Sequence, residues 1–544
     1  MKILKADDLD HHGIVAGTID ELNIVEIIDS LVGVHEDEKI TTGEAIKAMI
    51  INGLGFTDRP MSLTPQFFEN CPVNILFREG VEACDFNRFK LARALDKIHE
   101  HGSEAIFVYL AQKIINQEQI DTKYCHLDTT SISVTGKYYE DSDERVVNIN
   151  YGHSKDHRPD LKQIVLETLV TQDGGVPLIC KVWDGNTSDD IIFRERVKSL
   201  IETLKEWDNK ILIADSKLYS EETAKYLKDI VFVTRIPETI KVTKDIIEMA
   251  ILKDKWTALS KIDDLKKYQE VRIEHYGIEQ RWLVVQSKKK EEQYRESQSK
   301  KIKKEAEAIS AEIKHLQAER FSCEHDGYKA LEEKSRKWKF HEYSGIEAII
   351  HNKYKGVGKP KKNQVPEKVS YQILVKEIKE KTDFISKDVT LSSCYVIGTN
   401  ASDEQGKAAE ILNHYSKEQQ KVERGFRFLK DPIFFASSLF LKKPSRIQGL
   451  LVVMTISLLV YAIAERKLRQ ALKAAQETLP NQINKPIKNP TLRWVFQMMS
   501  GIKRITVETN NSIEYVWLGL TEIRLKILSF FGKGVQSLYS INTG

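Results

Sequence analysis

Three acidic residues occupy positions from which their carboxylates could hold metal ions. Asp128 lies within the apolar-flanked segment YCHLDTTSI, and Asp215 follows the short apolar run ILIA. Burying an ionised carboxylate is costly unless a cation or hydrogen bonds compensate it. Glu423 lies in KVERGFRFLKDP, among several cations. Any one of the three could equally be an exposed or helix-capping acid.

The segment around Glu423 is expected to be a helix along the edge of a core. Its apolar positions recur at helical spacing: Val422, Phe426 and Leu429. Pro432 ends the helix, and Arg427 and Lys430 follow Glu423 at i+4 and i+7 on the same face. An ordinary surface helix with ion pairs would explain these charges as well.

Three carboxylates around two divalent ions suit the chemistry of phosphodiester bonds. Mg²⁺ prefers carboxylate oxygens and keeps several waters. Two such ions, about 3.5 to 4 Å apart, can activate an attacking water or 3′-hydroxyl and stabilise the leaving oxygen. Arg427 and Lys430, one and two turns beyond Glu423, would then contact the flanking phosphates.

The periodicity of apolar residues predicts the elements that position these acids. Residues from about 18 to 117 have helical spacing, which fits either a DNA-binding bundle or a packing role. From Tyr124 the period changes to two, in CHLDTTSISVTG, VVNINYG and IVLETLVTQDGGVPLICKVW, with Asp-Gly-Gly as a hairpin turn. The helix DIIFRERVKSLIETLKEW and the strand KILIADS follow. We therefore predict an α/β fold with a mixed sheet flanked by helices.

A long insertion, from about residue 236 to 392, interrupts this pattern. It contains a probable hairpin (YQEVRIEHYGIEQRWLVVQS), a charged helical segment, a basic loop (KYKGVGKPKK) and further strands. Between Ser287 and Gln364 there are 20 lysines and arginines against 13 acids. This segment is either a solvated helical pair or a surface that contacts nucleic acid.

Several protein classes are disfavoured. The six cysteines are far apart without a CxxC pair, which argues against a zinc ribbon or a disulfide framework and favours a cytoplasmic location. The start, MKILKADDLDHHG, lacks the apolar core of a signal peptide. The apolar run Ile447–Ala464 is single and interrupted by polar residues, so we expect a buried core helix and no membrane span. No GxxxxGK[ST] motif occurs, so no nucleotide cofactor is expected.

Histidines offer a different site. His126, His153 and His157 could belong to a phosphoesterase centre, although GHSKDHRPD is more typical of a loop and isolated histidines are usually structural. In the same loop, Lys155 and its charged neighbours could contact DNA or cap strands.

The ordered set HLDTTSISVTG, GHSKDHRPDLKQIVLETLVTQDGGVPLICKVWDGNTSD, LIADSKLYS and VERGFRFLKDP resembles the DDE transposases of bacterial insertion sequences. More narrowly, it is similar to the branch with a Tyr-Arg-Glu-Lys signature, the insertion-sequence-four superfamily. The resemblance covers about residues 121–475 and extends to the N-terminal helices. It implies an RNase H-like fold with a β-rich insertion, and it assigns the catalytic and metal-binding acids to Asp128, Asp215 and Glu423.

The signature is only partly present. Its Lys falls on Lys430, but its Arg and Tyr fall on Gln419 and Ser416, with Tyr415 one residue away. The resemblance therefore implies contacts to DNA phosphates from a mixed set of residues: Lys430, Arg427, Arg424 and Tyr415.

The resemblance also implies a domain order and a function. The expected parts are a helical N-terminal DNA-binding domain (1–117), the first part of the RNase H-like core (118–235), the insertion domain (236–392), the second part of the core with the catalytic helix (393–475) and a helical C-terminal region (476–544). Such a transposase would bind terminal inverted repeats and target DNA as a homodimer. It would cleave and join strands with two Mg²⁺ or Mn²⁺ ions per active site. A metal-dependent nuclease without strand transfer, or an inactive DNA-binding descendant, remains an alternative.

Overall fold

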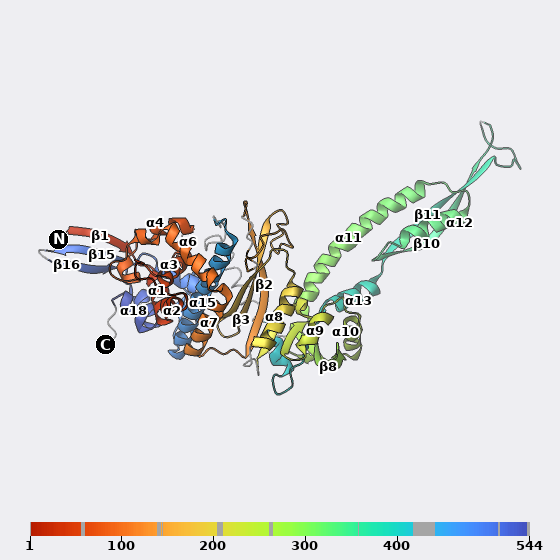
Figure 1. The fold of residues 1–544 in the computed structure, drawn as a ribbon. Helices are drawn as coiled ribbons and strands as arrows, with labels where there is room; N and C mark the ends of the chain where they lie inside the picture. The colour runs from red at the N-terminus through yellow and green to blue at the C-terminus, as the bar shows by residue number, and fades with distance from the viewer. Residues whose placement is uncertain are drawn as a thin grey trace. The chain divides into compact units, whose positions relative to one another are not determined.

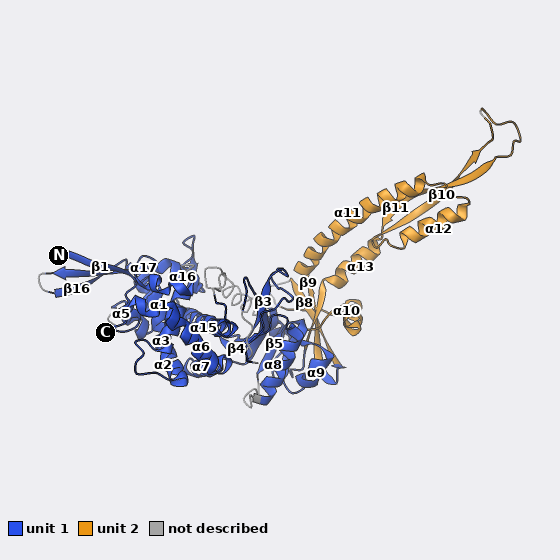
Figure 2. Ribbon diagram, turned by 45° about the horizontal axis from the view of Figure 1, so that its top comes forward, with its two compact units in different colours: residues 1–234, 274–280, 399–544 blue, residues 235–273, 281–398 orange. Residues whose placement is uncertain are grey.

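The computed structural model describes residues 2–55, 60–138, 143, 145–203, 210–259, 265–356, 358–416, 441–509 and 512–540. The chain divides into two compact units (Figure 2). The first comprises Met1–Thr234, Glu274–Gln280 and Thr399–Gly544, and the second comprises Arg235–Ile273 and Arg281–Gly398. The second unit covers nearly the same residues as the expected insertion.

The N-terminal part of the first unit is helical, as its periodicity predicts. Its helices are α1 (His12–Glu21), α2 (Ile24–Val32), α3 (Thr42–Leu54), α4 (Thr64–Phe68), α5 (Val73–Leu76), α6 (Arg88–Glu100) and α7 (Ser103–Gln117). Local side chains fix two of the starts. Thr41 and Glu44 form a capping box at α3, and the Asn87 side chain accepts hydrogen bonds from the first turn of α6.

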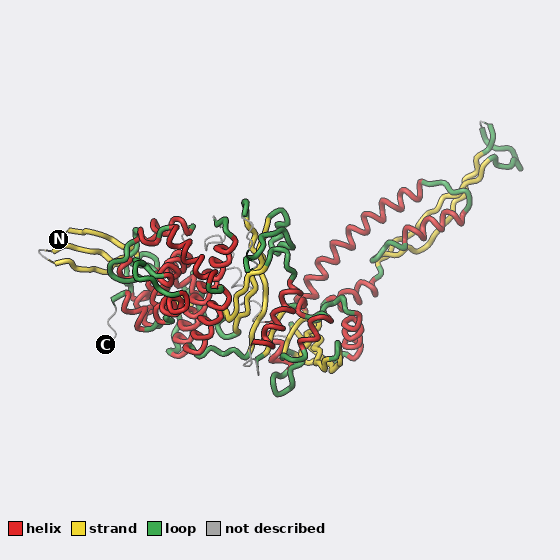
Figure 3. The backbone as a smooth tube through the Cα atoms, viewed as in Figure 1, coloured by secondary structure: helices red, strands yellow, loops and turns green. Residues whose placement is uncertain are grey.

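These helices pack around α15 (Pro444–Ala474), so the two ends of the chain share one hydrophobic core (Figure 1, Figure 3). By length and composition α15 could cross a membrane, but 89% of its most apolar stretch is buried within the fold. Gly449 allows α15 to approach α6, because an added Cβ would lie 3.0 Å from the carbonyl oxygen of Leu95. This pattern is that of a core helix.

The C-terminal region contains strands as well as the expected helices. Its elements are β13 (Leu479–Pro480), β14 (Pro486–Ile487), α16 (Leu492–Met499), β15 (Lys503–Thr509), β16 (Ser512–Leu518), α17 (Glu522–Ser529) and α18 (Lys533–Leu538). β1 (Lys2–Asp8) pairs antiparallel with β15, which pairs with β16. The prediction of a purely helical region missed the two-residue alternation in KRITVET and SIEYVWL.

The first unit also contains the RNase H-like mixed sheet. Its strands are β2 (Tyr124–Val134), β3 (Lys162–Thr171), β4 (Pro177–Trp183), β5 (Ile211–Ala214) and β6 (Val231–Arg235), in the order β4-β3-β2-β5-β6. β2, β3 and β4 are antiparallel, whereas β5 lies parallel to β2 and to β6. Helices α8 (Asp189–Thr203) and α9 (Glu221–Leu227) follow β4 and β5. The predicted fold class is confirmed.

Local predictions within this sheet had mixed outcomes. The turn between β3 and β4 contains Gly174 and Gly175, both with positive φ, as the Asp-Gly-Gly motif predicts. The segment VVNINYG was expected to be a strand, but it forms only an isolated bridge between Asn150 and Gln163. It forms a loop because its backbone also makes hydrogen bonds to other segments. For example, the carbonyl oxygen of Asn148 accepts from the N–H of Gly185.

The second unit combines short strands with long helices and a two-stranded ribbon. Its elements are α10 (Lys241–Lys253), β7 (Thr257–Ala258), β8 (Lys266–His275), β9 (Ile278–Ser287), α11 (Lys288–Ala318), α12 (Glu324–Ser335), β10 (His341–Lys353), β11 (Lys368–Glu380), α13 (Thr382–Ser392) and β12 (Cys394–Thr399). The predicted hairpin is β8 and β9, joined by Tyr276 and Gly277, which both have positive φ. The charged segment is the helical pair α11 and α12.

Candidate active site

Two of the three predicted acids lie side by side. In the parallel pairing of β2 with β5, Leu127 is opposite Ala214, so Asp128 of β2 is level with Asp215, which directly follows β5. Asp215 is the N-cap residue of the short 3₁₀ helix Ser216–Leu218, and its Oδ1 accepts a hydrogen bond of 2.8 Å from the N–H of Lys217. The position after the end of a parallel strand is where α/β folds usually place their sites.

Asp128 is only partly compensated. Its side chain is 28% exposed, and its Oδ1 accepts a hydrogen bond of 2.7 Å from the N–H of Thr129. The pKa of Asp128 is raised to about 7, chiefly by burial. The ammonium of Lys155 and the N–H of Thr129 oppose this rise, and the carboxylates of Asp215 and Asp189 contribute to it. Burial also raises the pKa of Asp215. Two adjacent carboxylates with raised pKa values are a favourable place for a cation.

The sequence did not identify the network beside this pair. The Nζ of Lys155 donates to the backbone oxygen of Thr129 at 2.8 Å and to its Oγ1 at 2.6 Å, and lies 3.1 Å from Oδ2 of Asp189. The Thr129 hydroxyl donates to Oδ1 of Asp189 at 2.5 Å. Lys155 therefore uses all three of its donors within this network and lies 4.0 Å from Asp128.

Two local features build this network. Asp189 is the first residue of α8, where a carboxylate is favourable to the helix dipole. Ser131 of β2 positions Lys155, because the backbone N–H of Lys155 donates to its Oγ at 2.9 Å. Asp189 belongs to the GNTSD motif. In the sequence, this motif was the only feature that could have indicated Asp189 as part of the site.

The donor set fits a hard divalent ion. Carboxylate oxygens are the ligands that Mg²⁺ and Mn²⁺ prefer, and Mg²⁺ commonly uses one or two protein carboxylates. Within the described part of the chain, no group of three or more His, Cys, Asp or Glu could hold a metal ion. The third expected acid, Glu423, and the expected phosphate contacts Arg424, Arg427 and Lys430 lie outside the described residues.

A helical segment that precedes Glu423 in the sequence is described, and its side chains contact β2. Residues 408–416 are helical. The hydroxyl of Tyr124 donates to Glu410 at 3.1 Å, and the ring of His414 stacks on Tyr124 with centroids 3.9 Å apart. Tyr415 is 9% exposed, which leaves little of its ring for a DNA phosphate in this conformation. Its DNA contact stays a prediction.

The histidine alternative gains no support among the described residues. His126 is 4% exposed within β2, and His157 lies in a loop with positive φ. Neither they nor His153 belong to a group that could hold a metal ion.

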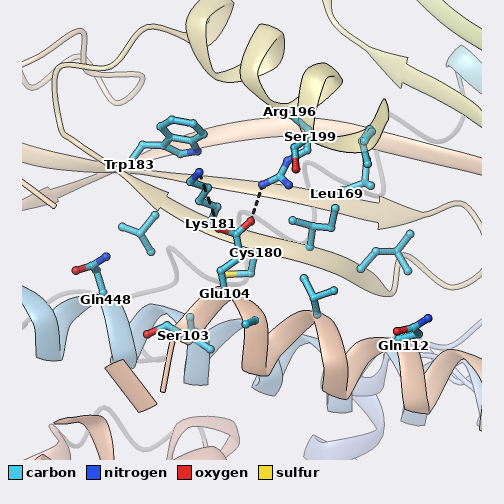
Figure 4. A pocket seen from close by; sticks show the side chains of 18 of the residues that line it. Ser103, Glu104, Gln112, Leu169, Cys180, Lys181, Trp183, Arg196, Ser199 and Gln448 are labelled. Carbon is cyan, nitrogen blue, oxygen red and sulfur yellow. Dashed lines mark hydrogen bonds and ion pairs between the residues drawn. The ribbon is translucent and has the colours of Figure 1, made fainter. Parts of the chain in front are cut away.

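A separate cavity of about 1350 Å³ lies in the first unit, between α7 and α15 and the sheet (Figure 4). Glu104, Lys181, Arg196 and Gln448 contribute to its lining, whereas Asp128 and Asp215 do not. Arg196 of α8 donates to Glu104 at 3.0 Å. The cavity is therefore distinct from the acid pair.

Two protein families match parts of this chain. The family described as Transposase DDE domain matches residues 125–460, and a domain of unknown function, DUF4277, matches residues 4–112. No curated protein sequence matches the chain. A solved structure with weak similarity is the piggyBac transposase in a synaptic complex with hairpin DNA, with 8% identity, 90% of this chain and 79% of that chain covered, and a TM-score of 0.37. Because the DDE domain match spans more than half of its length, this chain belongs to the DDE transposase family.

Proposed function

We propose that this protein is the transposase of an insertion sequence of the Tyr-Arg-Glu-Lys branch, which binds the terminal inverted repeats and catalyses strand cleavage and strand transfer. The observation that carries the proposal is the register of β2 and β5, which brings Asp128 in the middle of β2 together with Asp215 directly after β5, on interior strands of an RNase H-like sheet. The family itself implies DNA transposition.

Asp128, Asp215 and Glu423 are the proposed ligands of two Mg²⁺ or Mn²⁺ ions. When bound, such ions activate the attacking oxygen and stabilise the leaving oxygen of a phosphodiester. Asp128 and Asp215 supply negative charge where these two strands meet. The Lys155 network holds one positive charge beside them, and Lys430, Arg427, Arg424 and Tyr415 are the proposed contacts to the DNA strand.

The remaining parts of the molecule would serve DNA recognition and assembly. The N-terminal helices are the proposed readers of the inverted repeats, and a homodimer would hold the two ends of the element together. The protein would act in the cytoplasm on double-stranded DNA without a nucleotide cofactor.

The test is a reaction of the purified protein with labelled DNA that carries the ends of the element, with Mg²⁺, with Mn²⁺ and with EDTA. Asp128→Asn, Asp215→Asn and Glu423→Gln are tested beside the wild type. We expect metal-dependent cleavage at the ends and joining to target DNA, both lost in all three variants, while DNA binding is kept.

Other outcomes lead to different conclusions. Cleavage without joined products would indicate a nuclease, and binding of the ends without cleavage in any metal would indicate an inactive descendant. If Glu423→Gln cleaved at the wild-type rate, the assignment of the third ligand would be wrong.

A further inference from the structure

The ribbon of β10 and β11 is the longest hairpin of the second unit. The strands pair antiparallel from His341 opposite Glu380 to Lys353 opposite Lys368. In the views of Figure 1 and Figure 2 its far end extends beyond α11 and α12 of the same unit. An isolated two-stranded hairpin is marginally stable in water, so its base needs support.

The base of the ribbon is fixed by a small core. The cluster packs α11 and α12 against β11 and comprises Ile309, Ile313, Leu316, Leu331, Trp338 and Ile373. Phe321 and Tyr371 exchange two backbone hydrogen bonds of 2.8 and 2.9 Å. Glu305 of α11 accepts bonds from the N–H groups of Lys339 and Phe340 at 2.7 and 2.8 Å. The base is thereby held in one geometry.

The far end has a different charge pattern, and we call it the lysine tip. It comprises six exposed lysines: Lys353, Lys355, Lys359, Lys361, Lys362 and Lys368. Only one acid, Glu367, occurs between residues 353 and 368. Nearer the base, in contrast, Lys376 forms an ion pair with Glu347 at 3.2 Å and Lys379 with Glu377 at 3.0 Å. The positive charge is therefore concentrated at one end of the ribbon.

The loop that carries these lysines has its own hydrogen bonds. The backbone N–H of Gln364 donates to the carbonyl oxygen of Lys361 at 3.0 Å, and the side-chain Oε1 of Gln364 accepts from the backbone N–H of Lys361 at 3.0 Å. Its side-chain amide also donates to the carbonyl oxygen of Lys355 at 3.4 Å. One glutamine thus joins both sides of the loop and keeps the lysines close to one another.

We propose that the lysine tip is a binding site for double-stranded DNA, which it contacts through the phosphates that border a groove. The inference rests on the proposed function, because it names the element of the insertion that holds the DNA. A two-stranded ribbon has the width to enter the major groove, and each lysine can neutralise one phosphate. Because these contacts go to phosphates and not to base edges, the binding is independent of base sequence.

The test compares two sets of lysines on the same ribbon in the full-length protein. The tip variant is Lys355→Gln/Lys359→Gln/Lys361→Gln/Lys362→Gln. The matched pair of double variants is Lys361→Gln/Lys362→Gln at the tip and Lys376→Gln/Lys379→Gln near the base. Binding to a labelled 40-bp duplex of arbitrary sequence is measured from 50 to 200 mM salt.

We expect the salt dependence of binding to come from the tip lysines. Each lost phosphate contact should reduce the magnitude of the slope of log K against log salt by about 0.9. The slope should therefore fall by about 3 to 4 in the fourfold tip variant and by about 2 in Lys361→Gln/Lys362→Gln. The base double variant should bind as the wild type does. Acetylation of the wild type with and without DNA should show protection of the tip lysines but not of Lys376 or Lys379.

Equal slopes and equal lysine acetylation for tip and base would overturn the inference while leaving the proposed function standing, provided that the wild type binds DNA. Failure of the wild type to bind any duplex would overturn both. Because all substituted lysines are exposed, unchanged circular dichroism and thermal midpoints are expected for every variant.

Discussion

Two carboxylates on the paired strands β2 and β3 differ in how completely their charges are compensated by neighbouring groups. Glu167 lies opposite Thr129, next to the level of Asp128, and is fully buried. Arg196 donates to Glu167 from Nε at 2.5 Å, and Trp183 donates from its indole at 2.7 Å. Asp128 receives one backbone hydrogen bond and has its nearest described ammonium 4.0 Å away.

The difference distinguishes an acid that stabilises the fold from the acid that we propose as a metal ligand. The Glu167 pair satisfies its charges internally, and it attaches α8 to the sheet. Asp128 keeps unsatisfied negative charge beside Asp215, where an external cation can add stabilisation. A buried carboxylate with a complete set of partners therefore indicates a role in the fold, whereas a pair of adjacent, partly compensated carboxylates indicates a candidate site.

The strongest test of this contrast is Asp128→Asn. We expect DNA cleavage to fall about a thousandfold or more, because the variant lacks a proposed metal ligand, whose loss would cost several kcal/mol in the transition state. The free energy of unfolding should stay the same or rise slightly, since a poorly compensated charge is removed. Single-turnover cleavage and chemical denaturation measure the two effects. A strongly destabilised variant would contradict the assignment.

The converse variant is Glu167→Gln. It leaves the guanidinium of Arg196 buried with reduced compensation, so we expect a loss of about 3 to 5 kcal/mol in the free energy of unfolding. The double variant Glu167→Met/Arg196→Met should recover much of this loss, because neither charge then remains. If Glu167→Gln were as stable as the wild type, the pair would not hold α8 in place.

A third test uses two buried groups that are held neutral. His11 and His12 are buried where α1 begins, and His11 donates from Nε2 to the carbonyl oxygen of Leu54 at 2.8 Å. Burial lowers the pKa of His11 to about 3 and that of His12 to about 4. Below pH 6.5 the unfolded chain binds protons that the folded chain does not, so stability falls as the pH falls towards 4.

Each histidine should contribute a loss of about 1.4 kcal/mol per pH unit over that range. Denaturation curves between pH 7 and 5 measure the slope, and His12→Phe serves as the control that should remove its own share. A slope that is the same in this variant and in the wild type would show that His12 does not carry the effect.

The smallest expected effect concerns Lys155. Its positive charge opposes the rise in the pKa of Asp128, so Lys155→Met should raise that pKa further above its value of about 7. Protons compete with metal for the carboxylate, so Mn²⁺ affinity, measured by calorimetry or spectroscopy, should decline at a higher pH than in the wild type. Lys155→Arg keeps the charge and should shift the decline little. An unchanged midpoint in Lys155→Met would show that this charge does not act on Asp128.

Local patterns predicted the elements that lie close together in sequence. The alternation in IVLETLVTQDGGVPLICKVW predicted the hairpin of β3 and β4, and the long apolar run in α15, interrupted by a few polar residues, predicted a buried helix. The position of Asp215 directly after ILIA was also visible, because a strand end follows from its own residues. Such features depend on contacts within a few residues and are therefore readable from spacing.

Other features depended on residues far apart. The VVNINYG segment alternates as a strand does, but it forms a single bridge because hydrogen bonds to distant segments replace a strand ladder. The N-terminal and C-terminal regions looked like separate domains, yet both pack on α15. Nothing local in either region specifies a partner several hundred residues away.

The period of each element, the apolar faces and the candidate acids could be predicted from residue type and spacing. Which acid has a full set of partners depends on contacts between segments that are far apart in the chain. Lys155 is 26 residues from Thr129, and Asp189 is 60 residues from it, so their network exists only where β2, the loop after it and the start of α8 meet. Charge compensation acts through space, and for that reason the fold separates Asp128 from Glu167.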